Sequence, residues 1–215
     1  MDIEILFEDN DIVVCIKPCG ILSQSDAKNG ENMIDLLHDI CDSQIFPLHR
    51  LDREVGGVMV YAKNKNSAAE LSKAIANNSF NKEYIALVHG VPENLCGEMH
   101  DLLFKDSGKN KSFVVKRERK GVKKAALAYR TIKTISIDNE DFSIQAIKLY
   151  TGRTHQIRVQ FSSRKMALAG DKKYGAKDNF RNIGLWSHKI GFNHPKTKEY
   201  IEFSASPQNF IKDYI

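Results

Sequence analysis

Short apolar runs, each the length of a strand, constrain the fold of this chain more than any other feature. Ile12–Ile16, Val58–Tyr61 and Tyr84–Val88 are such runs, and their length and composition are typical of buried strands. Further strands are predicted over residues 3–7, 125–135, 141–150, 185–192 and 200–203. Since strands outnumber helices, we expect an α+β fold with a mixed, mostly antiparallel sheet and flanking helices.

Two or three helices are predicted between these strands. Residues 31–41 carry apolar side chains at helical spacing. Ser67 to Glu70 has the capping-box pattern and precedes a second apolar face that ends near Asn77. Thr154 is predicted to cap a third helix over residues 155–161. The apolar periodicity is weak between Pro92 and Lys124.

Length and composition predict a soluble protein with a packed core. The chain has 215 residues, of which 42% are hydrophobic and 27% charged. This length suits one large domain or two small ones, and we expect one domain over residues 1–215. The N-terminus lacks the pattern of a signal peptide, and no apolar run approaches the ~18 residues of a membrane span. A cytoplasmic protein without membrane contact is therefore expected. We also expect a monomer, although the sequence leaves the oligomeric state open.

The sequence supports neither a metal nor a nucleotide cofactor. The four cysteines (Cys15, Cys19, Cys41 and Cys96) do not have the spacing of a zinc site. Glycine-rich phosphate-binding motifs and paired metal ligands at helical spacing are also missing from the sequence. We therefore expect chemistry that uses protein side chains alone.

Asp52 lies in a segment that suits a functional acid. It is surrounded by His49, Arg50 and Arg53 and is followed by Gly56-Gly57 and an apolar strand. A carboxylate is ionised at neutral pH, and neighbouring guanidinium groups favour the ionised form further. This environment suits a nucleophile or an anion-pairing group, not a general acid. On spacing alone, an Arg–Asp pair that fixes a turn explains the segment equally well.

A second polar segment runs from Thr151 to Arg158. Arg153 stands at the predicted start of a helix, where the helix dipole does not favour a cation. Its placement suggests an outside anion, or a carboxylate such as Asp52. The alternative is an exposed polar helix face. Tyr84, taken alone, is typical of a core aromatic residue.

Positive charge is concentrated in residues 105–124. This window holds nine Lys or Arg and two acids, a net charge of +7, whereas the whole chain carries +5. Such a concentration favours contact with the phosphates of RNA or DNA, although many charge runs are simply solvated loops. The predicted RNA contacts in the window are Lys116, Arg117, Arg119, Lys120 and Lys123.

Together these stretches resemble the RluA-type family of RNA pseudouridine synthases. The matching segments, in family order, are His49-Arg50-Leu51-Asp52, Lys82 to Val88, Gly152-Arg153-Thr154-His155-Gln156-Ile157-Arg158 and Ala169 to Gly175. The Lys17-Pro18-Cys19-Gly20 opening and the His194-Pro195 ending are also similar. Two departures are Val55-Gly56-Gly57, where the family usually has Thr-Ser-Gly, and Ala169 in place of Leu. An S4-like domain, common in relatives, is expected to be absent.

The resemblance implies isomerisation of uridine to pseudouridine in ribosomal or transfer RNA, in a cleft across the sheet. Asp52 would be the nucleophile or charge partner, with attack at C1′, attack at the base and glycal formation all open. Arg158 would pair with Asp52, and Tyr84 would stack on or brace the base. Arg50 would enter the RNA stack as the uridine flips out, a step that costs least in loops. The remaining implied RNA contacts are His49, Arg53, Arg153 and His155.

Two other function classes remain open on sequence alone. Val55-Gly56 is compatible with a non-catalytic RNA-binding or chaperone module. Asp52 and Glu54 could in principle serve as the two carboxylates of a nucleoside or glycoside hydrolase.

Overall fold

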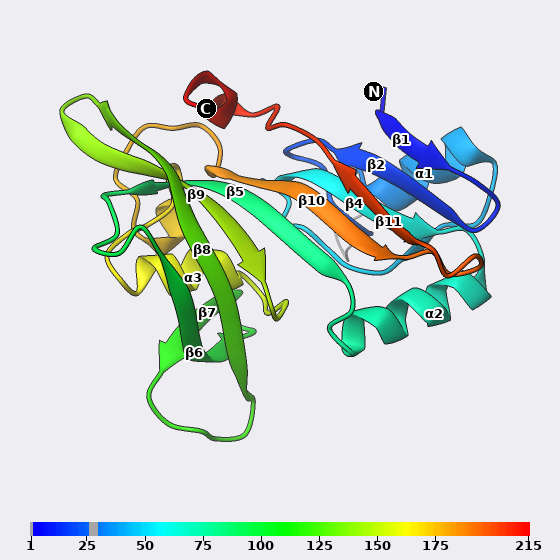
Figure 1. The fold of residues 1–215 in the computed structure, drawn as a ribbon, viewed down its shortest axis with the longest axis horizontal. Helices are drawn as coiled ribbons and strands as arrows, with labels where there is room; N and C mark the ends of the chain where they lie inside the picture. The colour runs from blue at the N-terminus through cyan, green and yellow to red at the C-terminus, as the bar shows by residue number, and fades with distance from the viewer. Residues whose placement is uncertain (1, 26–29) are drawn as a thin grey trace. The chain divides into compact units, whose positions relative to one another are not determined.

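The computed structural model describes residues 2–25 and 30–215. Contacts within the chain separate two units (Figure 1). Unit 1 comprises Met1–Lys82 and Trp186–Asn209, and unit 2 comprises Glu83–Leu185 and Phe210–Ile215. The expectation that they act as one catalytic domain stays a prediction.

The sheet of unit 1 is mixed because it contains a parallel strand pair. Its strands are β1 (Ile5–Glu8), β2 (Ile12–Lys17), β3 (Phe46–Pro47), β4 (Gly56–Ala62), β10 (Leu185–Asn193) and β11 (Tyr200–Ser204). β4 runs parallel to β10, with Gly56 opposite Trp186. The pairs β1–β2, β2–β4, β3–β4 and β10–β11 are antiparallel. The helices are α1 (Met33–Cys41) and α2 (Lys65–Ala76), and Leu71 of α2 packs against the buried β-branched residues of β2 and β4.

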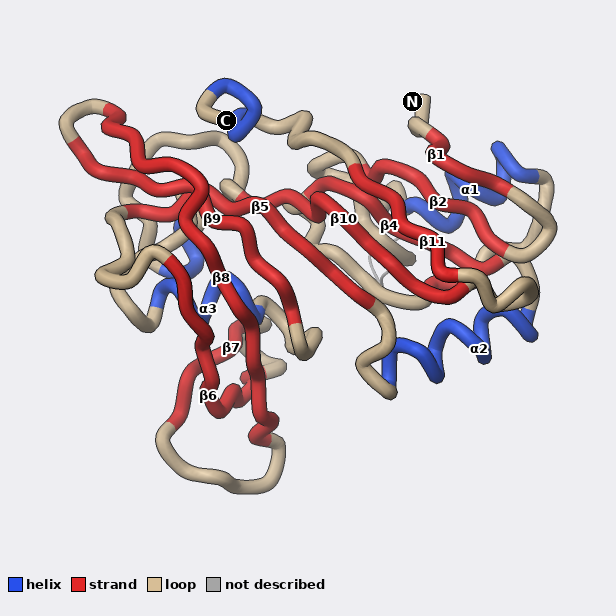
Figure 2. Tube along the Cα trace, in the orientation of Figure 1, coloured by secondary structure: helices blue, strands red, loops and turns tan. Residues whose placement is uncertain are grey.

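Unit 2 is built on an antiparallel sheet in the order β5-β9-β8-β6-β7 (Figure 2). The strands are β5 (Asn81–His89), β6 (Cys96–Asp106), β7 (Lys111–Val115), β8 (Val122–Ile137) and β9 (Glu140–Leu149). The helical elements are α3 (Gln156–Ser162) and the 3-10 turns η1 (Lys172–Tyr174) and η2 (Phe210–Asp213). Val159 of α3 and Tyr174 pack on Leu103 and Ala125, so α3 covers one face of β6 and β8. The predicted α+β class with a mixed, mostly antiparallel sheet is confirmed.

The predicted cap of α2 is wrong by three residues. The helix begins at Lys65, and the side chain of Asn64 accepts a hydrogen bond of 2.9 Å from the backbone N–H of Ser67. The hydroxyl of Ser67 donates to Asp11 Oδ1 instead. Asn and Ser are both good caps, so the sequence pattern did not distinguish them.

Thr154 does not cap α3, contrary to the sequence prediction. The residue before the helix is His155, in the left-handed conformation with φ of 53° and without a side-chain cap. The carbonyl of Thr154 accepts a hydrogen bond from Ser112 Oγ of β7. A long-range contact, which the local sequence does not encode, therefore fixes this turn.

Two strands, β6 and β7, occupy the segment where apolar periodicity is weak. In β6 only Met99 and Leu103 are buried, and they lie four positions apart, so polar and charged residues interrupt the apolar pattern. Among the helices of the described residues, none combines the length and apolar character required to span a bilayer.

Candidate active site

Asp52 lies on the loop between β3 and β4 in unit 1. Its side chain is half-buried, whereas Arg50 and Arg53 on either side are exposed. The backbone N–H of Val55 donates to the Asp52 carbonyl at 3.0 Å and closes a tight turn just before β4. The chain thus leads from the acid directly into a fully buried strand.

Both neighbours of Asp52 are held through their backbone. Ser23 Oγ donates to the Leu51 carbonyl at 2.9 Å and accepts from the Leu51 N–H at 3.0 Å. The Arg53 carbonyl accepts from the Gly20 N–H at 2.8 Å and from Lys17 Nζ at 3.2 Å. Because residues on each side are fixed to segment 17–23, the position of the Asp52 backbone is fixed as well.

Lys17 is a buried cation beneath this loop. Its Nζ also donates to the carbonyls of Pro18 at 2.8 Å and Ile21 at 2.7 Å. Burial lowers the pKa of Lys17 to about 8, and the negative charge of Asp52 is among the opposing influences. Lys17 therefore joins the two loops and is an electrostatic neighbour of the acid.

Gly56 and Gly57 allow β4 to approach β10 closely. Gly57 has φ of +126°, and a Cβ there would lie 2.3 Å from the Ser187 carbonyl oxygen. A Cβ on Gly56 would lie 2.6 Å from Cζ3 of Trp186. The departure from the family's Thr-Ser-Gly is thus explained at Gly56, because the indole ring of Trp186 occupies the space of a side chain.

His49 has contacts inside unit 1. Its Nε2 accepts a hydrogen bond of 3.3 Å from the Val60 backbone N–H, and its ring centroid lies 5.5 Å from that of Phe80. Burial, assisted by the charge of Lys82, lowers the pKa of His49 to about 3. His49 is therefore a neutral acceptor, and its predicted contact with RNA stays a prediction.

Arg158 of α3 forms a buried pair with Asp171 in unit 2. Arg158 Nε and Nη2 donate to the two carboxylate oxygens at 2.7 and 2.8 Å, and the two residues are 5% and 1% exposed. The guanidinium carbon lies 5.1 Å from the ring centroid of Tyr174. This bidentate geometry sets the plane and direction of the guanidinium. The alternative of an exposed polar helix face is wrong, since Gln156, Arg158 and Gln160 are all buried.

A second network fixes the turn before α3. Gln156 Oε1 accepts from the Arg153 N–H at 3.0 Å and from Thr151 Oγ1 at 2.8 Å. His155 Nδ1 lies 2.9 Å from Tyr174 Oη, which accepts from the Ser112 N–H at 2.8 Å. The predicted RNA contact Arg153 is exposed, and its Nε donates to the Lys124 carbonyl.

Tyr84 is buried on β5, opposite Ile147 of β9. Tyr84 and Arg158 belong to unit 2, whereas Asp52 belongs to unit 1, so their joint action stays a prediction.

The sequence alone assigned no role to Asp171, Lys17 or Ser23. Asp171 and Lys17 lie in segments that match the family, and this match was the signal that could have identified them.

The predicted RNA contacts of the basic window are all exposed in or beside the β7–β8 loop. They are Lys116, Arg117, Arg119, Lys120 and Lys123.

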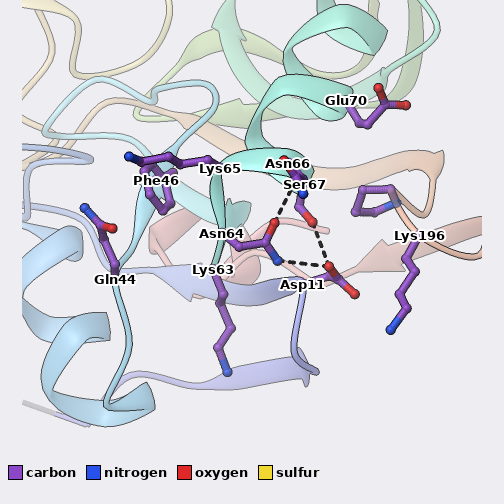
Figure 3. Close-up of a pocket in the computed structure, with 11 residues that line it drawn as sticks. Asp11, Gln44, Phe46, Lys63, Asn64, Lys65, Asn66, Ser67, Glu70 and Lys196 are labelled. Atoms are coloured by element: carbon purple, nitrogen blue, oxygen red, sulfur yellow. Dashed lines mark hydrogen bonds between the residues drawn. The ribbon is translucent and has the colours of Figure 1, made fainter.

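Unit 1 also contains a polar hollow of about 650 Å³ beside the start of α2 (Figure 3). Lysine side chains and the carboxylates of Asp11 and Glu70 line it together. Hydrogen bonds from Asn64 and Ser67 lower the pKa of Asp11 against its desolvation. A negative carboxylate among the lysines makes this hollow a poor match for a phosphate.

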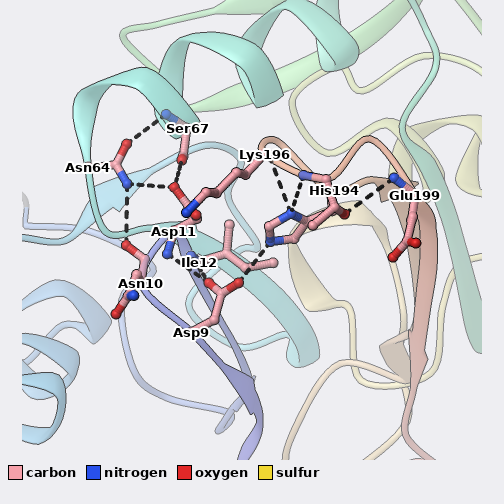
Figure 4. Close-up of polar contacts among 10 residues, drawn as sticks. Asp9, Asn10, Asp11, Ile12, Asn64, Ser67, His194, Lys196 and Glu199 are labelled. Carbon is pink, nitrogen blue, oxygen red and sulfur yellow. Dashed lines mark hydrogen bonds and ion pairs between the residues drawn. The ribbon is translucent and has the colours of Figure 1, made fainter.

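Asp9, Asp11 and His194 lie close enough to suggest a metal site next to this hollow (Figure 4). However, His194 Nδ1 accepts from the backbone N–H groups of Lys196 and Thr197. The proton therefore resides on Nε2, which lies 2.9 Å from Asp9 Oδ2. A metal requires an unprotonated ring nitrogen. The arrangement therefore indicates a hydrogen bond between His194 and Asp9 that joins two turns, not a metal site.

Sequence comparison connects this chain with RNA-modifying enzymes. The family model described as RNA pseudouridylate synthase matches residues 11–163. Ribosomal large subunit pseudouridine synthase C of Buchnera aphidicola is 32% identical over 218 residues, which cover 96% of this chain and 67% of the relative. An uncharacterized RNA pseudouridine synthase of Bacillus subtilis is 30% identical over 216 residues, covering 95% and 69%.

Comparison of structures gives the same fold. Human RNA pseudouridylate synthase domain containing 1 superimposes with a TM-score of 0.79 at 20% identity, covering 96% of this chain and 84% of that one. Human RNA pseudouridylate synthase domain containing 4 gives 0.76 at 20% identity, covering 97% and 90%. The chain belongs to the RNA pseudouridylate synthase family and is an isomerase that converts uridine in RNA to pseudouridine.

Proposed function

We propose that this enzyme modifies ribosomal RNA of the large subunit, with Asp52 as the reacting carboxylate. The relatives in Buchnera aphidicola and Borreliella burgdorferi are named ribosomal large subunit pseudouridine synthases C and D, which supports ribosomal over transfer RNA. The observation that carries the role of Asp52 is the double attachment of its neighbours to Ser23, Gly20 and Lys17. A carboxylate that must meet a ribose at a defined angle benefits from such a fixed backbone.

The reaction rearranges one nucleotide without loss of atoms. The C1′–N1 bond breaks, the uracil turns, and a C5–C1′ bond forms, while a proton leaves C5 and N1 gains one. Asp52 acts as nucleophile at the ribose–uracil unit, and Arg158 holds it ionised and aimed. The pair with Asp171 aims Arg158 in turn. Tyr84 braces the detached base.

The target uridine has to leave its stack before it reaches Asp52. Extrusion costs a few kcal/mol and least in loops, so we propose a loop or bulge as the site. Arg50 is exposed two residues before the acid. Its guanidinium fills the space that the base leaves, since an arginine plane stacks well on neighbouring bases.

Asp52→Asn tests the chemistry. We expect the variant to fold and to bind RNA, yet to form no pseudouridine, because the amide is a far weaker nucleophile. Glu54→Gln is the matched control, since Glu54 is an exposed acid two positions away, and it should retain activity. Wild-type turnover by Asp52→Asn contradicts the proposal, and release of free uracil by the wild-type protein indicates a hydrolase.

Pseudouridine mapping of total RNA, with and without the gene, tests the substrate. We expect one or a few signals in large-subunit ribosomal RNA to disappear on deletion and to return with the wild-type gene but not with Asp52→Asn. Loss confined to transfer RNA contradicts the proposed target but not the chemistry.

A further inference from the structure

One face of β6, β7 and β8 is turned away from α3. Leu103 of β6 packs against Val159 of α3, and side chains alternate along a strand, so Leu102 and Phe104 point to the opposite face. The strand register places Phe113, Phe104 and Val122 side by side in one row across the three strands. An apolar row with two aromatic rings therefore lies on the face away from Arg158.

Two adjoining hollows lie along this face. One, of about 450 Å³, is lined by Leu102, Glu118, Arg119, Val122 and Lys124. The other, of about 260 Å³, shares Leu102 and Lys124 with the first and extends toward His100 and Thr151. Together they form a shallow path along β6 and β8.

Cations accompany the aromatic rings. The guanidinium carbon of Arg119 lies 4.7 Å from the centroid of Phe104, and Lys111 Nζ lies 5.8 Å from that of Phe113. Phe113 itself is 37% exposed. Two acids line this path, and Asp101 pairs with Arg164 at 2.9 Å. Glu118 is 3.4 Å from Lys124, and both of these side chains are more than 60% exposed. Such an exposed pair is weak, so an incoming phosphate can displace Glu118 from Lys124.

We propose that this face, defined by Leu102, Phe104, Phe113, Arg119 and Lys124, binds an unpaired stretch of the substrate RNA outside the modified nucleotide. A base stacks on Phe113, and the adjoining phosphates pair with Arg119 and Lys124. Exposed aromatic rings beside cations are the usual platform for single-stranded nucleic acid, and the net charge of +7 over residues 105–124 complements a phosphate chain. The inference rests on the proposed function in so far as RNA is the substrate.

Anisotropy with a fluorescein-labelled twelve-nucleotide oligouridine at low salt tests the stacking step. Phe113→Leu should weaken binding by about 5- to 140-fold, the range found when a stacked base loses its aromatic partner. Phe113→Tyr should bind within about twofold of wild type, because the ring is retained. Phe7→Leu is the control, since Phe7 is also 37% exposed and contacts a second phenylalanine, Phe203, but lies in unit 1 beside Glu8.

Unchanged affinity in Phe113→Leu overturns the proposal and leaves the face to a protein partner. Equal losses in Phe113→Leu and Phe113→Tyr, or a similar loss in Phe7→Leu, also overturn it. The double variant Arg119→Gln, Lys124→Gln provides a second test, which leaves the row of apolar side chains intact. It should reduce the slope of log affinity against log salt by about 0.7 per lost phosphate contact, and an unchanged slope contradicts the phosphate contacts.

The failure of this inference is distinguishable from failure of the proposed function. Asp52→Asn should bind the oligouridine like wild type while making no pseudouridine. If Asp52→Asn stays active but Phe113→Leu binds weakly, the reacting residue is wrong and the platform stands. If Asp52→Asn is inactive but Phe113→Leu binds normally, the chemistry stands and the platform is wrong.

Discussion

Arg158 and Asp171 are joined by two hydrogen bonds, of 2.7 and 2.8 Å, in a buried pair. Removing one partner leaves the other charge buried without compensation, which typically costs about 3–5 kcal/mol. We therefore expect Asp171→Asn to lower the free energy of unfolding by an amount of this order and to reduce pseudouridine formation sharply, because Arg158 loses its orientation. Urea denaturation and pseudouridine formation in the proposed ribosomal RNA substrate measure the two effects.

Glu202→Gln is the matched control for that substitution. Glu202 pairs with Lys189 at 2.9 Å, but the side chains are 43% and 28% exposed. Partly exposed pairs contribute about 0–1 kcal/mol. If the two variants lose the same free energy of unfolding, burial does not make the Arg158–Asp171 pair more stabilising than a partly exposed pair.

Ser23→Ala should loosen the Asp52 loop. The hydroxyl of Ser23 bonds both backbone groups of Leu51, and leaving buried backbone groups without partners costs about 1–3 kcal/mol. We expect a lower kcat with a smaller change in KM, since the carboxylate is misplaced in the transition state. Ser79→Ala, which removes an exposed hydroxyl bonded to the Ala74 carbonyl, should leave both constants unchanged. A change in the KM of Ser23→Ala with kcat unchanged contradicts this expectation.

Gly56→Ser restores a side chain that the family usually carries, and it should be harmful here. Its Cβ would meet Trp186 at 2.6 Å, and overpacking typically costs about 1–3 kcal/mol. Gly56→Ser combined with Trp186→Leu should be less destabilised than the sum of the single variants, as measured by a double-mutant cycle in urea. Gly108→Ser is the control, because a Cβ there meets no atom closer than 3.5 Å. Strict additivity of the two changes contradicts the steric explanation.

Lys17 should make stability depend on pH in the alkaline range. Its pKa is about 8 in the folded protein against an ordinary value of 10.5, so the unfolded chain binds more protons between these values. The sign follows directly: stability rises as pH increases from 8 to 10.5, and below pH 8 the contribution is constant at its least favourable level. Relative to Lys17→Met, which cannot titrate, wild type should gain about 2 kcal/mol between pH 8 and 10 in urea unfolding. Parallel pH profiles of the two proteins contradict the lowered pKa.

The sequence predicts a strand well where the residues of that strand form a continuous apolar run. The buried runs of β2, β4 and β5 are apolar throughout much of their length and appear where expected. β6 and β7 lack such a signal, since only one of their faces is covered by α3 and the other mixes charged with apolar residues. Their pairing depends on residues that lie outside any local window.

The site shows the same division. Asp52 and Arg158 stand out in the sequence because charged residues cluster around them in segments that match the family. Their partners are harder to identify, although Asp171 also lies in a segment that matches the family. Asp171 is 13 positions away from Arg158, and Ser23 is 28 positions away from Leu51, so local sequence does not encode either contact. The burial of Lys17 also could not be predicted from the sequence. Its charge is compensated by three backbone carbonyls, and every residue type has such a carbonyl.

The discontinuous composition of unit 1 has a consequence for biosynthesis. Its strands β2 and β4 come early in the chain, but β10, which pairs with β4 at Gly56 and Gly57, belongs to the second stretch, Trp186–Asn209. A ribosome that has translated the first half has therefore released the acid-bearing loop while β4 still lacks this neighbour. Because domains form as units during translation, the half-made protein exposes an apolar strand edge, and nascent chains stalled before Trp186 should recruit chaperones that full-length chains no longer need.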